Sequence, residues 1–172
     1  MNAKDKQYMK QIRDLFNEHN IAEVTVDYSG GGDSGSSTPG YLVKMDGTRL
    51  YLHGSDTVPE KDEEEFSLLI EGQPCVIQVW TPNGYINTES TRDISFSDLM
   101  MEVADYFVDR QHGGWANNEG GRGTVTISRP REGIEALAEV QRQRITVLTE
   151  HVDYIQTEEA SDHVYAFDIE DS

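Results

Sequence analysis

The sequence has one cysteine, few basic residues and no long apolar run. Cys75 has no second cysteine with which to form an intramolecular disulfide, and a zinc centre built on several thiolates is excluded as well. No stretch of about 18 apolar residues occurs, and the first residues lack the apolar core of a signal peptide. We therefore expect a cytoplasmic protein that does not contact a membrane. A chain of 172 residues is long enough for one domain over residues 1–172.

Basic residues are outnumbered, with 14 Lys and Arg against 32 Asp and Glu, which gives a net charge of -18. A polyanion would be repelled by such a chain, so direct nucleic-acid binding is not expected, whereas a basic protein partner would be attracted. No Lys or Arg follows Arg144, and acidic residues accumulate toward the segment 158–172. One interpretation is a solvated edge and tail; the other is a surface that imitates a phosphate backbone through Glu158, Glu159 and Asp162.

Two segments have the apolar spacing of amphipathic helices. In residues 4–19 the spacing i, i+3, i+4, i+7 predicts a helix that ends at Asn20. Residues 95–110 repeat the pattern, and Ser95 stands three residues before Asp98 in an arrangement like a capping box. A candidate short third helix lies in residues 134–141.

Strand patterns fill most of the remaining chain. They occur at 24–28, at 41–53 around the turn Asp46-Gly47, and at 66–70, 75–81, 124–128, 144–150 and 163–169. Strands joined mainly by turns, with two principal helices, predict a single α+β domain with a mainly antiparallel sheet. Residues 36–94 have the pattern of a β-rich insertion. Cys75 and Trp80 are expected to be buried strand residues.

Two glycine-rich segments are the candidate functional loops. Residues 29–40 contain Gly32-Asp33-Ser34-Gly35 and predict an irregular loop, since glycine and serine favour turns. Residues 112–123 place five glycines around His112, Trp115, Asn118 and Glu119. A tryptophan in so long a segment indicates a shaped loop.

These two motifs and the element order resemble the DUF6878 family of uncharacterised bacterial and phage proteins. Its members carry an early Gly-Asp-Ser-Gly segment and a late His-x-Gly-Trp-x-x-Asn-x-Gly loop. The resemblance covers residues 5–35 and 95–168, while residues 41–94 and 129–143 look like expansions. It implies an α+β fold and a phage or mobile-element origin, and it implies no activity.

Each loop has a structural and a functional interpretation. Asp33 and Ser34 can close a glycine-rich turn by accepting backbone hydrogen bonds, or Ser34 can act as a nucleophile with His53 or His112 as its base. Trp115 can plug the core while His112 caps the preceding helix. Alternatively His112, Asn118 and Glu119 face a cleft shared with Asp33. The histidines have no recognised metal spacing, so no metal or cofactor is predicted.

Two functions from different classes follow. The first is a non-enzymatic, acidic interaction or inhibitor protein that binds a basic, nucleic-acid-binding protein, because the charge is extreme and no complete catalytic set occurs. The second is a small enzyme or ligand-binding domain whose site is formed by the Asp33-Ser34 loop and the loop of His112, Trp115 and Asn118. That second function requires the two loops to meet in space.

Overall fold

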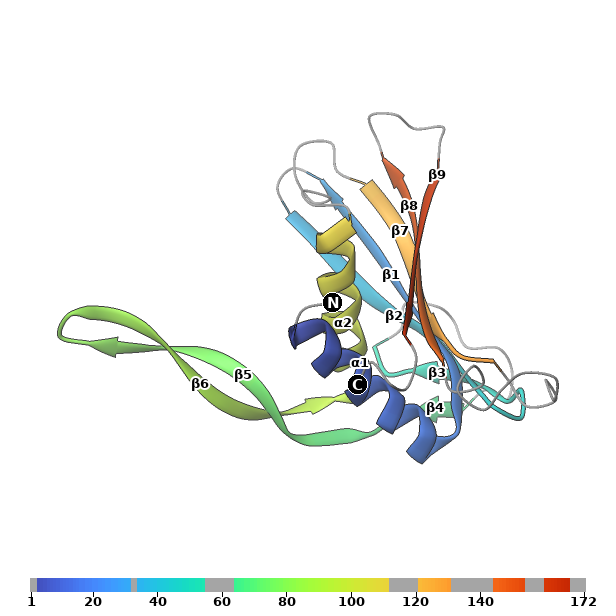
Figure 1. Ribbon diagram of the computed structural model, residues 1–172, viewed down its shortest axis with the longest axis horizontal. Coiled ribbons are helices and arrows are strands. Elements are labelled where there is room, and N and C mark those ends of the chain that lie inside the picture. Colours follow the sequence, from blue (N-terminus) through green and yellow to red (C-terminus); the bar gives the residue numbers. More distant parts are fainter. Residues whose placement is uncertain are drawn as a thin grey trace.

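The computed structural model describes residues 3–31, 34–54, 64–111, 121–130, 144–153 and 160–167 (Figure 1). Its helices are α1 (Ala3–His19) and α2 (Phe96–Gln111). Seven strands form the main sheet, and these are β1 (Ile21–Gly31), β2 (Ser34–Lys44), β3 (Arg49–Leu52), β4 (Glu64–Phe66), β7 (Gly121–Ser128), β8 (Ile145–Asp153) and β9 (Ala160–Phe167). A separate hairpin consists of β5 (Leu69–Thr81) and β6 (Gly84–Ser95).

The main sheet has the strand order β4-β3-β2-β1-β7-β8-β9. All of its neighbouring strands are antiparallel except β3 and β4, which run parallel. The predicted α+β class with a mainly antiparallel sheet is therefore confirmed. The candidate third helix at 134–141 lies outside the described residues.

Both helices cover the same face of the sheet (Figure 1). The predicted apolar stripe of α1 is confirmed, since Tyr8, Met9, Ile12 and Phe16 are buried. α1 ends where Asn20 takes a left-handed backbone with a φ of 54°, a conformation that asparagine tolerates better than most residues. Among the described residues, neither helix is long and apolar enough to cross a membrane.

α2 supplies the second layer of the core. The Ser95 hydroxyl accepts a hydrogen bond of 3.1 Å from the backbone N–H of Asp98, which confirms the predicted cap. The apolar face of α2 is buried against the sheet at Phe96, Leu99, Met100, Val103 and Phe107. Buried Asp5 of α1 accepts hydrogen bonds from Tyr106 and Arg110 of α2, so the two helices are joined by charge as well as packing.

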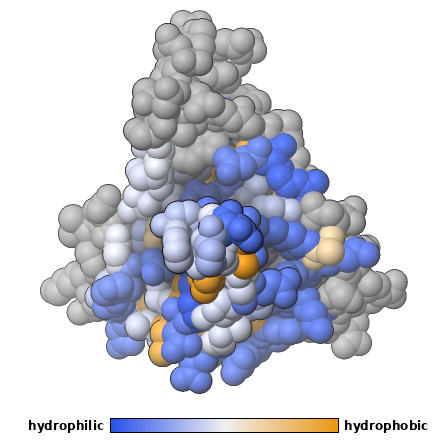
Figure 2. Space-filling view, turned by 90° about the vertical axis from the view of Figure 1, so that its left-hand side faces the viewer, coloured by the Kyte–Doolittle hydropathy of each residue, from blue (hydrophilic) through white to orange (hydrophobic). Residues whose placement is uncertain are grey.

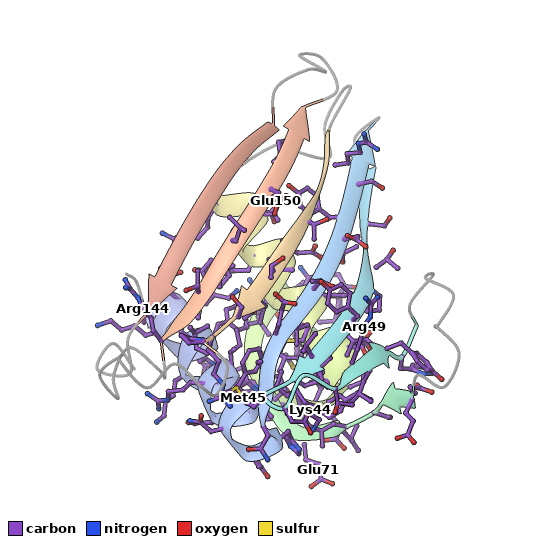
Figure 3. The ribbon with its side chains drawn as sticks, turned by 90° about the vertical axis from the view of Figure 1, so that its right-hand side faces the viewer. Lys44, Met45, Arg49, Glu71, Arg144 and Glu150 are labelled. Atoms are coloured by element: carbon purple, nitrogen blue, oxygen red, sulfur yellow. The ribbon has the colours of Figure 1, made fainter. Side chains whose placement is uncertain are left out.

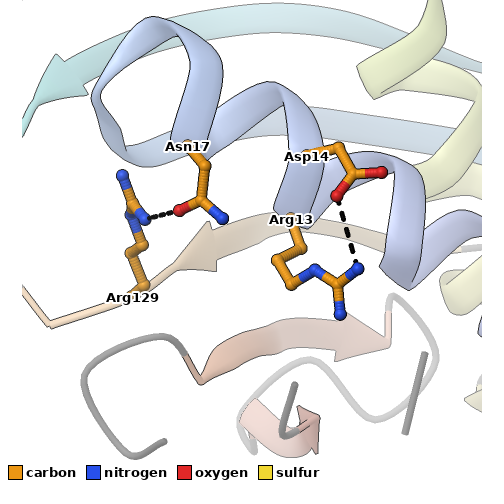
Figure 4. Close-up of polar contacts among 4 residues, drawn as sticks. All are labelled: Arg13, Asp14, Asn17 and Arg129. Carbon is orange, nitrogen blue, oxygen red and sulfur yellow. Dashed lines mark hydrogen bonds and ion pairs between the residues drawn. The ribbon is translucent and has the colours of Figure 1, made fainter. Parts of the chain in front are cut away.

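Arg129, directly after β7, fixes α1 to the sheet (Figure 4). Its guanidinium donates to the carbonyl oxygens of Phe16 at 2.9 Å and Ile21 at 2.8 Å, and to the side chain of Asn17. Phe16 lies in the last turn of the helix, where carbonyl groups lack helical partners. Partial burial lowers the pKa of Arg129, and the guanidinium keeps its charge because arginine titrates far above neutral pH.

The prediction that residues 29–40 form an irregular loop is wrong. Ser29 pairs with Ser36, Gly30 with Gly35 and Gly31 with Ser34, so β1 and β2 form one long hairpin. Sheet pairing overrides the turn preference of these small residues, because each backbone group finds a partner on the neighbouring strand. The predicted strand pair around Asp46-Gly47 is confirmed by β2 and β3.

The hairpin of β5 and β6 projects away from the body of the molecule (Figure 1). We call residues 73–92 of this hairpin the arm. Cys75 and Trp80 do lie in a strand, but their expected burial is wrong: Cys75 is half-buried and Trp80 is 67% exposed. A continuous apolar run is typical of a strand covered on both faces, yet no described element covers the arm beyond its root.

Candidate functional site

Described ends of β1, β2, β7 and β8 lie together at one end of the main sheet (Figure 1, top). Gly30, near the end of β1, pairs with Gly35 of β2 and with Gly121 at the start of β7. Gly121 in turn pairs with Asp153 at the end of β8. The connections 32–33, 112–120 and 154–159 therefore depart from adjacent strand ends, and α2 ends at the same side. We call this edge the glycine-rich end.

Most of the residues predicted as site residues belong to these connections. Asp33, His112, Trp115, Asn118, Glu119, Glu158 and Glu159 lie outside the described residues. Ser34 opens β2 opposite Gly31, and Asp162 lies in β9 opposite Glu150. The tertiary structure thus brings the described flanks of both predicted loops, and of the acidic segment, to the glycine-rich end.

The face of the sheet turned away from the helices contains a shallow hollow near this end. Its volume is about 440 Å³, and it is lined by polar strand residues that include Asp27, Ser29, Thr38, Arg122 and Thr124. Thr124 donates a hydrogen bond of 2.8 Å to the Asp27 carboxylate. No described helix covers this face, so the hollow opens to solvent (Figure 3).

A row of acidic positions crosses the same face. Asp27 of β1 pairs with Thr124 of β7, Thr124 pairs with Glu150 of β8, and Glu150 pairs with Asp162 of β9. Three of these four register positions are carboxylates, and we call them the acidic row. Neighbouring strands lie about 4.8 Å apart, so the row extends over roughly 14 Å. Asp27 and Glu150 are exposed, and Glu150 projects from the sheet in Figure 3.

On the opposite, helix-facing side a second row joins β1, β7 and β8. Tyr28 pairs with Gly123, and Gly123 pairs with His151. The Tyr28 ring reaches across Gly123, and its hydroxyl lies 2.6 Å from Nδ1 of His151. A Cβ atom on Gly123 would stand 2.5 Å from that hydroxyl and 2.0 Å from the carbonyl oxygen of Glu150. Glycine is therefore required at this position by close approach.

Tyr28 and His151 form a buried contact in which the Tyr28 hydroxyl is protonated. Both side chains are almost fully inaccessible, and their rings stack with centroids 5.7 Å apart. Burial raises the pKa of Tyr28 well above its ordinary value, because the phenolate would lose its hydration. The phenol therefore stays protonated and can donate to Nδ1 of His151.

Other polar groups lie on the helix-facing side. Ser37, the β2 register partner of Tyr28, donates a 3.3 Å hydrogen bond to the Asp105 carboxylate of α2. Burial raises the pKa of Asp105, and the Ser37 hydrogen bond opposes that shift. The hydroxyl of Thr149, two residues before His151, is fully buried without a partner among the described residues. Polar groups thus gather under the glycine-rich end.

These contacts could not be found from the sequence. Asp27 and Tyr28 stood out only as members of an alternating strand, and His151 only as one histidine with no metal spacing. The available signal was Gly123 inside a strand, since an isolated strand glycine often marks the close approach of another group. Only the register across β1, β7 and β8 shows that the approaching group is the ring of Tyr28.

Among the residues that the structure describes, no three His, Cys, Asp or Glu side chains are grouped as they would be around a metal ion. Comparison with family models, curated proteins and solved structures finds no match to this chain. The site is therefore interpreted from its own geometry.

Proposed function

We propose that this protein is an acidic interaction protein that binds a basic protein, of the kind that itself binds nucleic acid, through the open face of its sheet. The observation that carries the proposal is the acidic row of Asp27, Glu150 and Asp162 in a chain with a net charge of -18. A partner with a basic nucleic-acid site would meet carboxylate positions in one line across this face. Electrostatic complementarity of this kind guides encounter and selects partners.

Other charged side chains on the open face are also exposed and held on a rigid sheet, which suits them for binding a partner. Asp27, Arg122 and Glu150 are exposed on strands whose backbone is fixed on both sides by pairing. Side chains held on a rigid sheet lose little freedom on binding compared with side chains on a flexible tail. Glu158 and Glu159 follow β8 in the sequence, and we propose that they contribute to binding as well.

The test begins with a pull-down from nuclease-treated lysate of the native host, followed by titration of the recovered protein against two matched variants. Asp27→Asn with Glu150→Gln removes two charges from the acidic row. Glu18→Gln with Glu71→Gln removes two exposed charges elsewhere (Figure 3 shows Glu71 at the far end from Glu150). Exposed charge pairs contribute about 0.5–1 kcal/mol each, so we expect roughly a tenfold loss for the first variant.

The control variant should retain the affinity of the native protein within about twofold, by the same reasoning. Added salt should weaken the native complex, because exposed charge interactions are screened. Charge reversal at Glu158, Glu159 and Asp162 should abolish binding. Binding that is insensitive to salt, or equal losses in both double variants, would contradict the proposal.

A second candidate function is a small enzyme or ligand-binding site between the Asp33-Ser34 segment and the segment of His112, Trp115 and Asn118. The pairing of Gly30 with Gly121, which places the described flanks of both segments on adjacent strands, favours it. The buried proton-holding pair of Tyr28 and His151 lies close to those strand ends. Asp33→Ala and His112→Ala variants that fold but lose binding of a small ligand, found by screening, would support this function.

A further inference from the structure

Beyond its root, the arm has no covering element within the described chain. β5 and β6 pair only with each other, as a two-stranded sheet separate from the main sheet. The hairpin leaves the body at Gly72, whose φ is +69° and whose N–H donates to Asp93 at 3.2 Å. An isolated two-stranded hairpin is at best marginally stable in water. A partner that covers the arm would therefore bury its exposed apolar side chains and stabilise the hairpin.

Large apolar side chains are exposed on both faces of the arm. Trp80 and Tyr85 pair across the strands and are 67% and 70% exposed, on the same face as Val76. Val79 pairs with Ile86 on the opposite face. Figure 2 looks onto the projecting arm and shows small hydrophobic patches there amid a mainly hydrophilic surface. Large apolar side chains exposed in such number on one segment mark an interaction site.

Charge on the arm indicates which partner covers it. Residues 72–88 carry no Asp, Glu, Lys or Arg, although such residues make up 27% of the whole chain. A basic partner would gain no charge attraction from this segment. A second copy of the chain would meet an equally uncharged segment, so two copies with net charges of -18 can touch here without burying like charges. The centres of protein interfaces are depleted of charged residues in the same way.

A groove at the root of the arm provides a complementary surface. It has a volume of about 1000 Å³ and lies between the arm and helix α1, with Tyr8, Pro74, Cys75 and Val76 among its lining residues. Its charged lining residues are Lys4, Glu89, Arg92 and Glu102, whose formal charges cancel. Gln11 of α1 donates a hydrogen bond to Gln73, which fixes the root beside the helix. When two arms run in opposite directions, the tip of each lies at the root of the other. Such a contact is two-fold symmetric and closes on itself.

The arm is large enough for a stable dimer. One face of the arm carries Val76, Trp80 and Tyr85, which are 66%, 67% and 70% exposed. Each Trp or Tyr can bury about 150–250 Å², so the exposed parts of these three side chains give roughly 400 Å² per arm. Two such faces and the surfaces that they cover then bury about 1600 Å², the size of a standard stable interface. We propose that two copies of this chain dimerise by laying their arms side by side, tip to root.

The first test measures molar mass by sedimentation over a range of concentrations. The native chain should be dimeric, and Trp80→Ser with Tyr85→Ser should weaken the dimer by at least about 100-fold, since buried aromatic residues dominate interface energies. Leu69→Ser is the matched control, because Leu69 is 59% exposed but lies outside the arm. It should leave the dimer intact. Circular dichroism should show that both variants fold.

The second test examines the direction of the arms. A chain with Cys75→Ser and Asn83→Cys carries its thiol at the tip, whereas the native chain carries its thiol at the root. Mixed together and treated with a short thiol-reactive cross-linker, the two chains should form a mixed cross-linked dimer. A native chain that stays monomeric at all concentrations, an arm variant that dimerises like the control, or cross-linking of tip to tip would overturn the proposal.

Discussion

Substitution of Gly123 by alanine tests the row that joins β1, β7 and β8. The added Cβ would stand 2.0 Å from the carbonyl oxygen of Glu150 and 2.5 Å from the Tyr28 hydroxyl. The carbonyl belongs to a strand paired on both sides, so it cannot move without disturbing the ladder. Overpacking a well-packed interior costs about 1–3 kcal/mol, and a clash with a fixed backbone atom places this variant at the upper end.

We therefore expect Gly123→Ala to lower the free energy of unfolding by about 3 kcal/mol. For a protein of this size, each kcal/mol changes Tm by roughly 2–4 °C, so the expected decrease is about 6–12 °C. Differential scanning calorimetry at neutral pH measures it. Thr126→Ala, a partly buried position on the same strand, is the control and should change the free energy of unfolding by about 1 kcal/mol or less.

A Gly123→Ala variant that melts within about 2 °C of the native protein would refute the close approach of β8 and Tyr28 to this glycine. The double variant Tyr28→Ala with Gly123→Ala separates the two contacts. It removes the ring and leaves the Glu150 carbonyl in place, so its loss should be less than the sum of the single losses and greater than that of Tyr28→Ala alone.

Two other predictions concern stability. Arg129→Ala leaves the carbonyls of Phe16 and Ile21 without their charged donor, so it should lower the free energy of unfolding by about 2–3 kcal/mol, measured by chemical denaturation. Arg129→Lys should recover only part of that loss, because lysine cannot donate to all the acceptors in the same geometry. An Arg129→Ala variant as stable as the native protein would contradict this prediction. Burial raises the pKa of Asp105, so its contribution to stability is complete below the unfolded pKa of about 3.9 and is lost as pH rises through the folded pKa. Asp105→Asn retains an acceptor for Ser37 and does not titrate. The Tm of this variant minus the Tm of the native protein should therefore be larger at pH 7 than at pH 4. An equal difference at both pH values would contradict the raised pKa of Asp105.

Local sequence patterns were sufficient for the helices. The apolar spacing of α1, the stop at Asn20 and the cap at Ser95 depend on residues within a few positions of each other, so they can be predicted without tertiary information. The turn at Asp46-Gly47 is local in the same sense. The resemblance to the DUF6878 family, which depends on the two glycine-rich motifs, stays a prediction.

Strand pairing was harder to predict because its partners are distant in the chain. Residues 29–40 were expected to be irregular, yet the pairing of β1 with β2 makes most of them strand. The run that includes Cys75 and Trp80 was expected to be buried, yet it forms the arm. An apolar strand has the same sequence whether its own chain or another molecule covers it.

The sequence by itself determined the α+β class, the two helices, the excess of acidic charge and the presence of two glycine-rich segments. Only the tertiary structure decided that Gly30 pairs with Gly121, that Asp27, Glu150 and Asp162 share one row, and that Tyr28 meets His151 across Gly123. The physical reason is that helix periodicity and turn chemistry act over a few residues. Sheet register joins backbones up to 105 positions apart, at Glu23 and Ser128, and leaves little trace in the neighbouring sequence.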